Sequence, residues 1–137
     1  MIRLDNPWCY VAFGAFGLAT MVDIIDDDDA VRDSTRALLE SYGYEVRDHA
    51  SAEQFLQASG LKPDCLLVDQ HMPGMTGLDL LEHLRARGDQ TPALMMTGRS
   101  DPTLEPRAAR IGVTLLHKPV PEDQLVLWIE RARQSHA

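Results

Sequence analysis

The chain has very few cysteines: Cys9 and Cys65 are the only two among its 137 residues. Two cysteines do not make a disulfide framework, and Cys65 lies within an apolar run where a thiol packs as a small hydrophobic group. Long hydrophobic runs are lacking too, since the apolar stretch at residues 10–19 is too short to cross a bilayer. These absences argue against a disulfide-rich secreted domain and a membrane partner, and they predict a cytoplasmic protein.

Positive charge is also scarce. Against 21 Asp and Glu residues stand 13 Lys and Arg residues, which gives a net charge of −8 and an isoelectric point near 4.9. Nucleic acids and anionic membranes require clustered basic residues, so neither is expected as a direct partner. Mg²⁺ or a basic protein surface suits this chain better. The length and the hydrophobic fraction of 45% predict one globular domain with a sizeable core.

The first 20 residues differ in character from the rest. Residues 10–19 combine aromatic residues with Gly and Ala and have no regular hydrophobic period. They loosely resemble the apolar region of a signal peptide, but the single Arg3 makes a poor basic region ahead of it. We therefore predict an N-terminal extension of unclear role at residues 1–20 and one domain at residues 21–137.

From Met21 onward, short apolar runs alternate with stretches of helical period. Five such cycles predict an α/β fold with a five-stranded parallel sheet wound on both faces by helices. A continuously apolar run such as residues 65–68 is typical of a strand buried on both faces. The predicted strands are residues 22–25, 45–48, 65–68, 93–96 and 114–117.

The predicted helices follow these strands at residues 30–41, 51–56, 78–87 and 122–133, with a weakly specified helix around Pro106. Ser51 and Gln54 have the spacing of a capping box, and Gly43 is expected to end the first helix. The residues expected to face the core are Val31, Thr35, Leu38 and Leu39 in the first helix and Leu125, Trp128 and Ile129 in the last.

Four consecutive aspartates, Asp26 to Asp29, follow the first predicted strand and precede its helix. Such a junction lies at the carboxyl edge of a parallel sheet, where open α/β folds bind ligands. Carboxylates held together there repel one another and favour a bound divalent cation. The alternative is a solvated acidic run in which aspartates cap the helix and complement its dipole.

Three more chemically capable residues stand at strand ends: Asp69, Thr97 and Lys118. Taken singly, Asp69 is typical of a turn residue, Thr97 of a hydroxyl that hydrogen-bonds within its own turn, and Lys118 of a solvated lysine. In a parallel sheet, however, these ends share one edge with Asp26 and Asp27. Three carboxylates, a hydroxyl and an ammonium in one cleft suit a phosphoryl group carried on a carboxylate and held by Mg²⁺, lysine and hydroxyl.

The residues around these positions resemble the receiver domain of bacterial two-component response regulators, over residues 21–135. The resemblance implies the flavodoxin-like (βα)5 fold, in a protein that stands alone or belongs to a larger regulator or hybrid histidine kinase. It rests on four segments: IIDD at residues 24–27, LLVDQHMPGMTG at 66–77, MMTG at 95–98 and HKP at 117–119.

By this resemblance, Asp69 is the phosphoacceptor and takes a phosphoryl group from a histidine kinase or a phosphotransfer protein. Asp26 and Asp27 hold Mg²⁺ together with the Asp69 carboxylate and the backbone carbonyl of His71. Thr97 and Lys118 bind the phosphoryl oxygens, and the peptide bond after Lys118 is expected to be cis. The domain would be a signalling module that changes conformation and acts on a protein partner, rather than an enzyme.

Two features depart from the usual receiver pattern. Leu115 stands where many receivers carry an aromatic residue that couples to the switch threonine, so we expect an output that is weak or differently built. Pro106 lies in the predicted fourth helix, which commonly shifts in receivers, so the resemblance does not extend to the usual dimerisation face, and a homodimer is one option. His71 and Arg99 follow Asp69 and Thr97 by two positions. They either flank the phosphoryl group and tune its hydrolysis or simply reach solvent.

Two other functions fit parts of the sequence. In a haloacid-dehalogenase-type phosphatase, the spacing of Asp27 and Asp29 would make Asp27 the nucleophile, but the cap and the later acidic pair of that family are not found. A pseudo-receiver that is never phosphorylated would act purely as an interaction module. Leu115 is compatible with it, whereas the complete set of acidic and switch residues argues against it.

Overall fold

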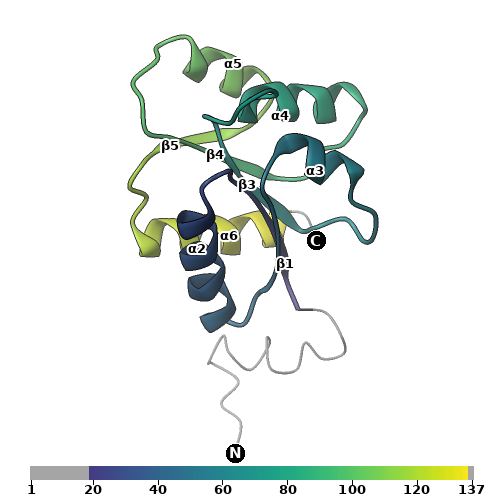
Figure 1. Cartoon of the computed structure of the whole chain (residues 1–137), viewed down its shortest axis with the longest axis vertical. Coiled ribbons are helices and arrows are strands. Elements are labelled where there is room, and N and C mark those ends of the chain that lie inside the picture. Colours follow the sequence, from purple (N-terminus) through teal and green to yellow (C-terminus); the bar gives the residue numbers. More distant parts are fainter. Residues whose placement is uncertain (1–18, 136–137) are drawn as a thin grey trace, which may run out of the picture.

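The computed structural model describes residues 19–135, which form a single parallel sheet of five strands with helices on both faces (Figure 1). The strand order is β2-β1-β3-β4-β5, which confirms the predicted fold class. The strands are β1 (Met21–Ile25), β2 (Glu45–His49), β3 (Cys65–Asp69), β4 (Ala93–Thr97) and β5 (Thr114–His117). The helices are α2 (Asp29–Ser41), α3 (Ala52–Gln57), α4 (Gly77–Ala86), α5 (Leu104–Arg110) and α6 (Glu122–Ser135).

The register brings the carboxyl ends of the strands to one edge of the sheet. Ile25 lies opposite Val68, Asp69 opposite Met96 and Thr97 opposite His117. Every residue of β3 and β4 is buried, as a strand covered on both faces requires. The residues that follow or close these strands are therefore neighbours on a rigid support.

Two hydrophobic cores hold the helices to the sheet. Figure 1 shows α2 and α6 on one face and α3, α4 and α5 on the other. Alternate residues of β3 serve the two faces: Leu66 and Val68 belong to the core under α3, α4 and α5, while Cys65 and Leu67 belong to the core under α2 and α6. Cys65 is fully buried, as predicted for a packed thiol.

The helix starts follow local side-chain chemistry. Asp28 caps α2 by accepting from the Val31 N–H, and Ser51 caps α3 by accepting from the Gln54 N–H. The Gln54 side chain does not return to Ser51 as in a full capping box but accepts from the Ala50 N–H.

The full capping box is in α4, between Thr76 and Asp79, where the sequence analysis did not identify it. Pro106 lies in the first turn of α5, the position where a missing N–H is tolerated.

The predicted inward face of α2 is partly wrong. Leu39 is fully buried, but Val31 is 36% exposed. The reason is the place of α2 beside the edge strand β2, where Arg32 and Arg36 turn toward Asp48 and form ion pairs with it. The helix is rotated so that arginines, rather than Val31, cover the end of that strand.

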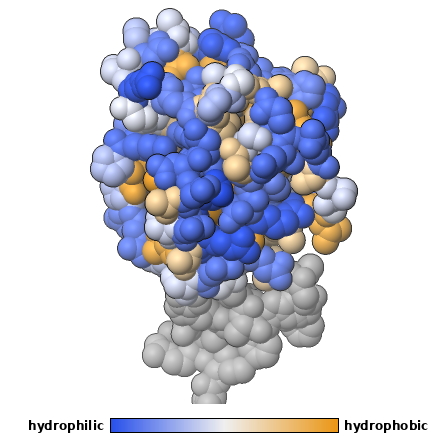
Figure 2. Space-filling model, in the orientation of Figure 1, coloured by the Kyte–Doolittle hydropathy of each residue, from blue (hydrophilic) through white to orange (hydrophobic). Residues whose placement is uncertain are grey.

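The outer surface agrees with the acidic, polar composition. Figure 2 shows mostly hydrophilic residues on the face that it presents, with hydrophobic residues scattered among them. None of the helices within residues 19–135 has the length and apolar character needed to cross a membrane. The predicted extension at residues 1–20 lies almost wholly outside the described residues.

Candidate functional site

Three carboxylates meet at the carboxyl edge of the sheet. Asp26 and Asp27 follow β1, Asp69 is the last residue of β3, and one oxygen from each lies within 4.8 Å of the others. Asp26 is 1% exposed and Asp69 is 4% exposed, whereas Asp27 faces solvent. The structure therefore brings together the acidic residues that the sequence placed at adjoining strand ends.

Nearly every polar atom of Asp26 is engaged. Its N–H donates to the His49 carbonyl at 3.1 Å, its Oδ1 accepts from the Asp28 N–H at 2.9 Å and its carbonyl accepts from Arg32 at 2.8 Å. The remaining oxygen, Oδ2, is buried without a hydrogen-bond partner. Burial raises the pKa of Asp26, and the charge of Asp69 raises it further.

The donor set fits a hard divalent cation. Magnesium prefers carboxylate oxygens in octahedral geometry and retains several waters, so a few carboxylates at an open edge suffice. Oδ2 of Asp26 is a buried acceptor without a hydrogen bond, and an oxygen of this kind is available as a metal ligand. An Mg²⁺ ion bound by Asp26, Asp27 and Asp69 would offset their mutual repulsion.

Lys118 completes the charge balance of the site. It follows β5, and its Nζ lies 2.9 Å from Asp69 Oδ1 and 3.7 Å from Asp26 Oδ2. Burial alone would lower the pKa of Lys118, but the hydrogen bond and charge of Asp69, with the charge of Asp26, raise it above its ordinary value. The peptide bond between Lys118 and Pro119 is cis, as the resemblance implied.

Thr97 ends β4 at this edge, and the hydrogen bonds of its hydroxyl go to His71 and Arg99 rather than to the carboxylates. The Oγ1 atom lies 3.0 Å from His71 Nε2, donates to the Arg99 carbonyl at 3.1 Å and accepts from the Arg99 N–H at 3.2 Å. With one proton and two lone pairs, the hydroxyl is fully used if His71 donates to it. The sequence analysis singled out His71 and Arg99 but did not predict that both hold Thr97.

The loop after Asp69 packs against that residue. A Cβ on Gly77 would lie 2.5 Å from the Asp69 carbonyl oxygen, so only glycine fits this approach. The Gln70 side chain accepts from the Leu78 N–H at 2.8 Å and ties the end of β3 to α4. Gln70 was missed because a buried glutamine in this role has no distinctive sequence pattern.

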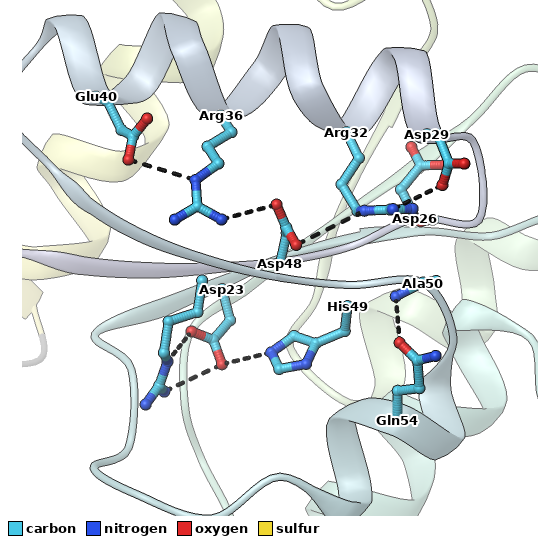
Figure 3. Close-up of polar contacts among 11 residues, drawn as sticks. Asp23, Asp26, Asp29, Arg32, Arg36, Glu40, Asp48, His49, Ala50 and Gln54 are labelled. Atoms are coloured by element: carbon cyan, nitrogen blue, oxygen red, sulfur yellow. Dashed lines mark hydrogen bonds and ion pairs between the residues drawn. The ribbon is translucent and has the colours of Figure 1, made fainter.

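Asp28 and Asp29 belong to the helix start. Asp28 is the N-cap of α2, and Asp29 pairs with Arg32 at 2.7 Å in the first turn (Figure 3). The acidic run thus divides in two: Asp26 and Asp27 lie with Asp69 in the carboxylate cluster, while Asp28 and Asp29 stabilise the start of α2.

A five-stranded parallel sheet with three carboxylates and a lysine at its carboxyl edge is the architecture of a signalling receiver domain, and comparison with known proteins agrees. Residues 22–130 match the family model described as response regulator receiver domain. The chain belongs to the response regulator receiver family.

Among the similar proteins are transcriptional regulatory proteins. The chain is 43% identical over 113 residues to the transcriptional regulatory protein FixJ of Azorhizobium caulinodans, covering 81% of this chain and 53% of that protein. It is 41% identical over 111 residues to FixJ of Bradyrhizobium diazoefficiens, covering 80% and 54%. The chain thus spans about half the length of these curated relatives.

Solved structures have the same fold. The response regulator StyR superposes with a TM-score of 0.78 at 35% identity, covering 86% of this chain and 61% of that one. A CheY-like receiver domain protein from Methanospirillum hungatei superposes with a TM-score of 0.79 at 28% identity, covering 86% and 96%. These likenesses identify the chain as a two-component signalling domain.

Proposed function

We propose that this domain accepts a phosphoryl group on Asp69 in a Mg²⁺-dependent reaction and passes the signal to a protein partner by changing conformation. The observation that carries the proposal is the buried Oδ2 of Asp26, which has no hydrogen-bond partner, beside the Asp69–Lys118 ion pair. The Asp69–Lys118 salt bridge does not need this second acid, whereas a divalent cation would use it as a ligand.

Each residue has a proposed role. Asp26, Asp27, Asp69 and the backbone carbonyl of His71 are the proposed Mg²⁺ ligands, and the ion supplies positive charge to the phosphoryl oxygens. Lys118 moves from Asp69 to a phosphoryl oxygen, a shift supported by its 2.9 Å contact with the acceptor carboxylate. Thr97 leaves Arg99 and donates its hydroxyl to another phosphoryl oxygen.

The proposed reaction asks little covalent chemistry of the protein. A carboxylate oxygen of Asp69 attacks phosphorus, an O–P bond forms, and the P–N bond of a phosphohistidine on the kinase or phosphotransfer protein breaks. Positioning and charge neutralisation then lower the barrier. Water later hydrolyses the acyl phosphate, so the domain catalyses only reactions of its own side chain.

The signalling context is part of the proposal. We propose a receiver domain at residues 21–137, in the cytoplasm, with a histidine kinase or phosphotransfer protein upstream. The relatives named FixJ are transcriptional regulatory proteins, which supports an output that reaches transcription through a downstream protein or effector domain. The net charge of −8 argues against direct nucleic-acid contact by this chain. A homodimer is a compatible form of the output.

The test is a mass measurement. The chain is incubated with acetyl phosphate and Mg²⁺, and the intact masses of wild type, Asp69→Asn and Asp27→Asn are compared. We expect one added phosphoryl group in wild type, none in Asp69→Asn, and none in wild type after addition of EDTA.

The other outcomes separate the alternatives. Labelling that persists in Asp69→Asn but disappears in Asp27→Asn would point to the phosphatase-type nucleophile. No labelling of folded wild type, by acetyl phosphate or by any phosphohistidine donor tried, would make the chain a pseudo-receiver and overturn the proposal.

A further inference from the structure

Arg32, in the first turn of α2, contacts the backbone of the candidate metal site. Its Nη1 donates to the carbonyl oxygen of Asp26 at 2.8 Å. This carbonyl lies one residue beyond the end of β1, outside the paired region of the sheet. Arg32 therefore supplies the donor that a neighbouring strand would otherwise provide.

Arg32 is itself held in place by acids from two directions. Its Nη2 lies 2.7 Å from Asp29 Oδ1, and its Nε, which is buried without a hydrogen-bond partner, forms a longer ion pair of 3.8 Å with Asp48 Oδ1 on β2. The side chain is only 13% exposed. Figure 3 shows the guanidinium between the helix, the β1–α2 junction and the end of β2. One planar group thus links three segments around Asp26.

The consequence for Asp26 is a fixed orientation. Its N–H, its Oδ1 and its carbonyl are bound by His49, Asp28 and Arg32. The Asp26 peptide cannot rotate without breaking the Arg32 hydrogen bond. With these three groups engaged, Oδ2 is the oxygen left for a metal ion.

We propose that Arg32 is a positioning residue for Mg²⁺ binding: by holding the Asp26 carbonyl, it fixes the direction in which Oδ2 of Asp26 meets Asp27 and Asp69. The inference rests on the proposed function, since it requires this site to take Mg²⁺. Arg32 acts through the backbone and touches neither metal nor phosphoryl group. A lysine replaces it only in part, because a single ammonium lacks the planar fork that reaches Asp26, Asp29 and Asp48 together.

Arg36 is a matched control on the same helix. Its Nη1 lies 2.9 Å from Asp48 Oδ2 and its Nε lies 3.3 Å from Glu40 Oε2 (Figure 3). It shares the Asp48 carboxylate with Arg32, but its hydrogen bonds go to Asp48 and Glu40 rather than to Asp26. Arg36→Met therefore removes one positive charge and one ion pair to Asp48, as Arg32→Met does, but it leaves the hydrogen bond from Arg32 to the Asp26 carbonyl in place.

The experiment compares Mg²⁺ dissociation constants, measured by isothermal titration calorimetry on the full chain. Losing a charged hydrogen bond that orients a ligand is expected to weaken Mg²⁺ binding about tenfold in Arg32→Met and about threefold in Arg32→Lys. Arg36→Met should stay within about twofold of wild type, as a distant surface change does. Urea unfolding in EDTA checks that both methionine variants are folded.

A second measurement separates positioning from a general structural role. In Arg32→Met, the Mg²⁺ concentration for half-maximal phosphorylation by acetyl phosphate should rise, while the rate at saturating Mg²⁺ stays near that of wild type. A loss of stability alone would change neither the half-maximal Mg²⁺ concentration nor the rate at saturating Mg²⁺, as long as the protein is folded. If Arg32→Met does not fold, Arg32→Lys carries both measurements.

Two results would overturn the inference: wild-type Mg²⁺ affinity in the folded Arg32 variants, or an equal loss of affinity in Arg36→Met. Failure of the proposed function looks different. If wild type itself bound no Mg²⁺, both ideas would fall together, whereas wild type that binds Mg²⁺ but accepts no phosphoryl group would overturn the proposed function alone. Normal Mg²⁺ binding in wild type and in Arg32→Met alike would remove only the role of Arg32.

Discussion

Asp26 is held in a form that costs stability. It is 1% exposed, lies near two other carboxylates and has an oxygen with no hydrogen-bond partner. Burial comes first among the causes that raise its pKa, and repulsion by Asp69 follows. Selection for fold stability alone would remove such a group, and its presence is a mark of function.

The first prediction concerns the pH dependence of this cost. Because the pKa of Asp26 is raised above its ordinary value of 3.8, the folded protein keeps this proton to higher pH than the unfolded chain does. Without metal, this group's contribution to stability is therefore lost as pH rises from 3.8 through the raised pKa.

Asp26→Asn removes that cost. In EDTA at neutral pH, urea unfolding should show a gain of about 1 kcal/mol in unfolding free energy, within the range of substitutions that relieve functional strain. The same variant should lose the stabilisation that Mg²⁺ gives to wild type. A less stable Asp26→Asn protein in EDTA would contradict this account.

The second prediction concerns His71 and Thr97. The Thr97 hydroxyl is engaged by His71 Nε2 at 3.0 Å, and under the proposed function it must leave this contact to bind a phosphoryl oxygen. Removing one hydrogen bond of about 1 kcal/mol in His71→Ala should ease the movement of Thr97 and raise affinity for the phosphoryl analogue beryllofluoride up to about fivefold. Affinity is measured by calorimetry with Mg²⁺ present.

A double-mutant cycle shows whether His71 acts through Thr97. In a Thr97→Ala background, the substitution of His71 should no longer change beryllofluoride affinity. His71→Gln, which retains a donor, should lie closer to wild type. An undiminished effect in the Thr97→Ala background would mean that His71 acts directly on the phosphoryl group.

At the scale of elements, the junctions between strands and helices position the site residues. At the junction after β3, Gly77 leaves no room for a side chain. A Cβ there would lie 2.5 Å from the Asp69 carbonyl oxygen, while a Cβ on Gly98 would meet nothing within 4 Å. Gly77→Ala should therefore shift the backbone of Asp69, destabilise the protein by about 1 to 3 kcal/mol and slow phosphorylation. Gly98→Ala is the control and should stay close to wild type, as measured by urea unfolding and acetyl phosphate labelling.

The same scale explains what the sequence could predict. Asp26, Asp69 and Lys118 were predicted together because parallel strands bring their carboxyl ends to one edge, whatever the details of the helices. The inward position of Val31 was wrong because hydrophobic period cannot show that Asp48 draws Arg32 and Arg36 onto that face.

Side-chain contacts across loops could not be predicted from the sequence. The bond between His71 and Thr97, the bond from Arg32 to the Asp26 carbonyl and the return of Gln54 to Ala50 depend on how far each side chain reaches over a turn. The residues themselves were visible in the sequence. Their directions were set only once the whole edge of the sheet was assembled.

At the scale of the whole molecule, the proposed site links metal binding to folding. The ligands come from two separate strands, so the unfolded chain has no such site, and Mg²⁺ should stabilise the folded state. At free Mg²⁺ about 100 times the dissociation constant, the expected gain in unfolding free energy is about 2.7 kcal/mol. Urea unfolding across a Mg²⁺ titration measures it, and Asp69→Asn should flatten the dependence.

The strand order has a consequence for the life of the protein. In the order β2-β1-β3-β4-β5, the two acidic strand ends lie at the centre, while the lysine arrives on the last strand to be made, at the far edge. A chain still emerging from the ribosome has Asp69 in place before Lys118 has been made. If the proposed roles of these two residues hold, an unfinished chain lacks the ammonium beside the acceptor carboxylate, and phosphorylation is restricted to the finished fold.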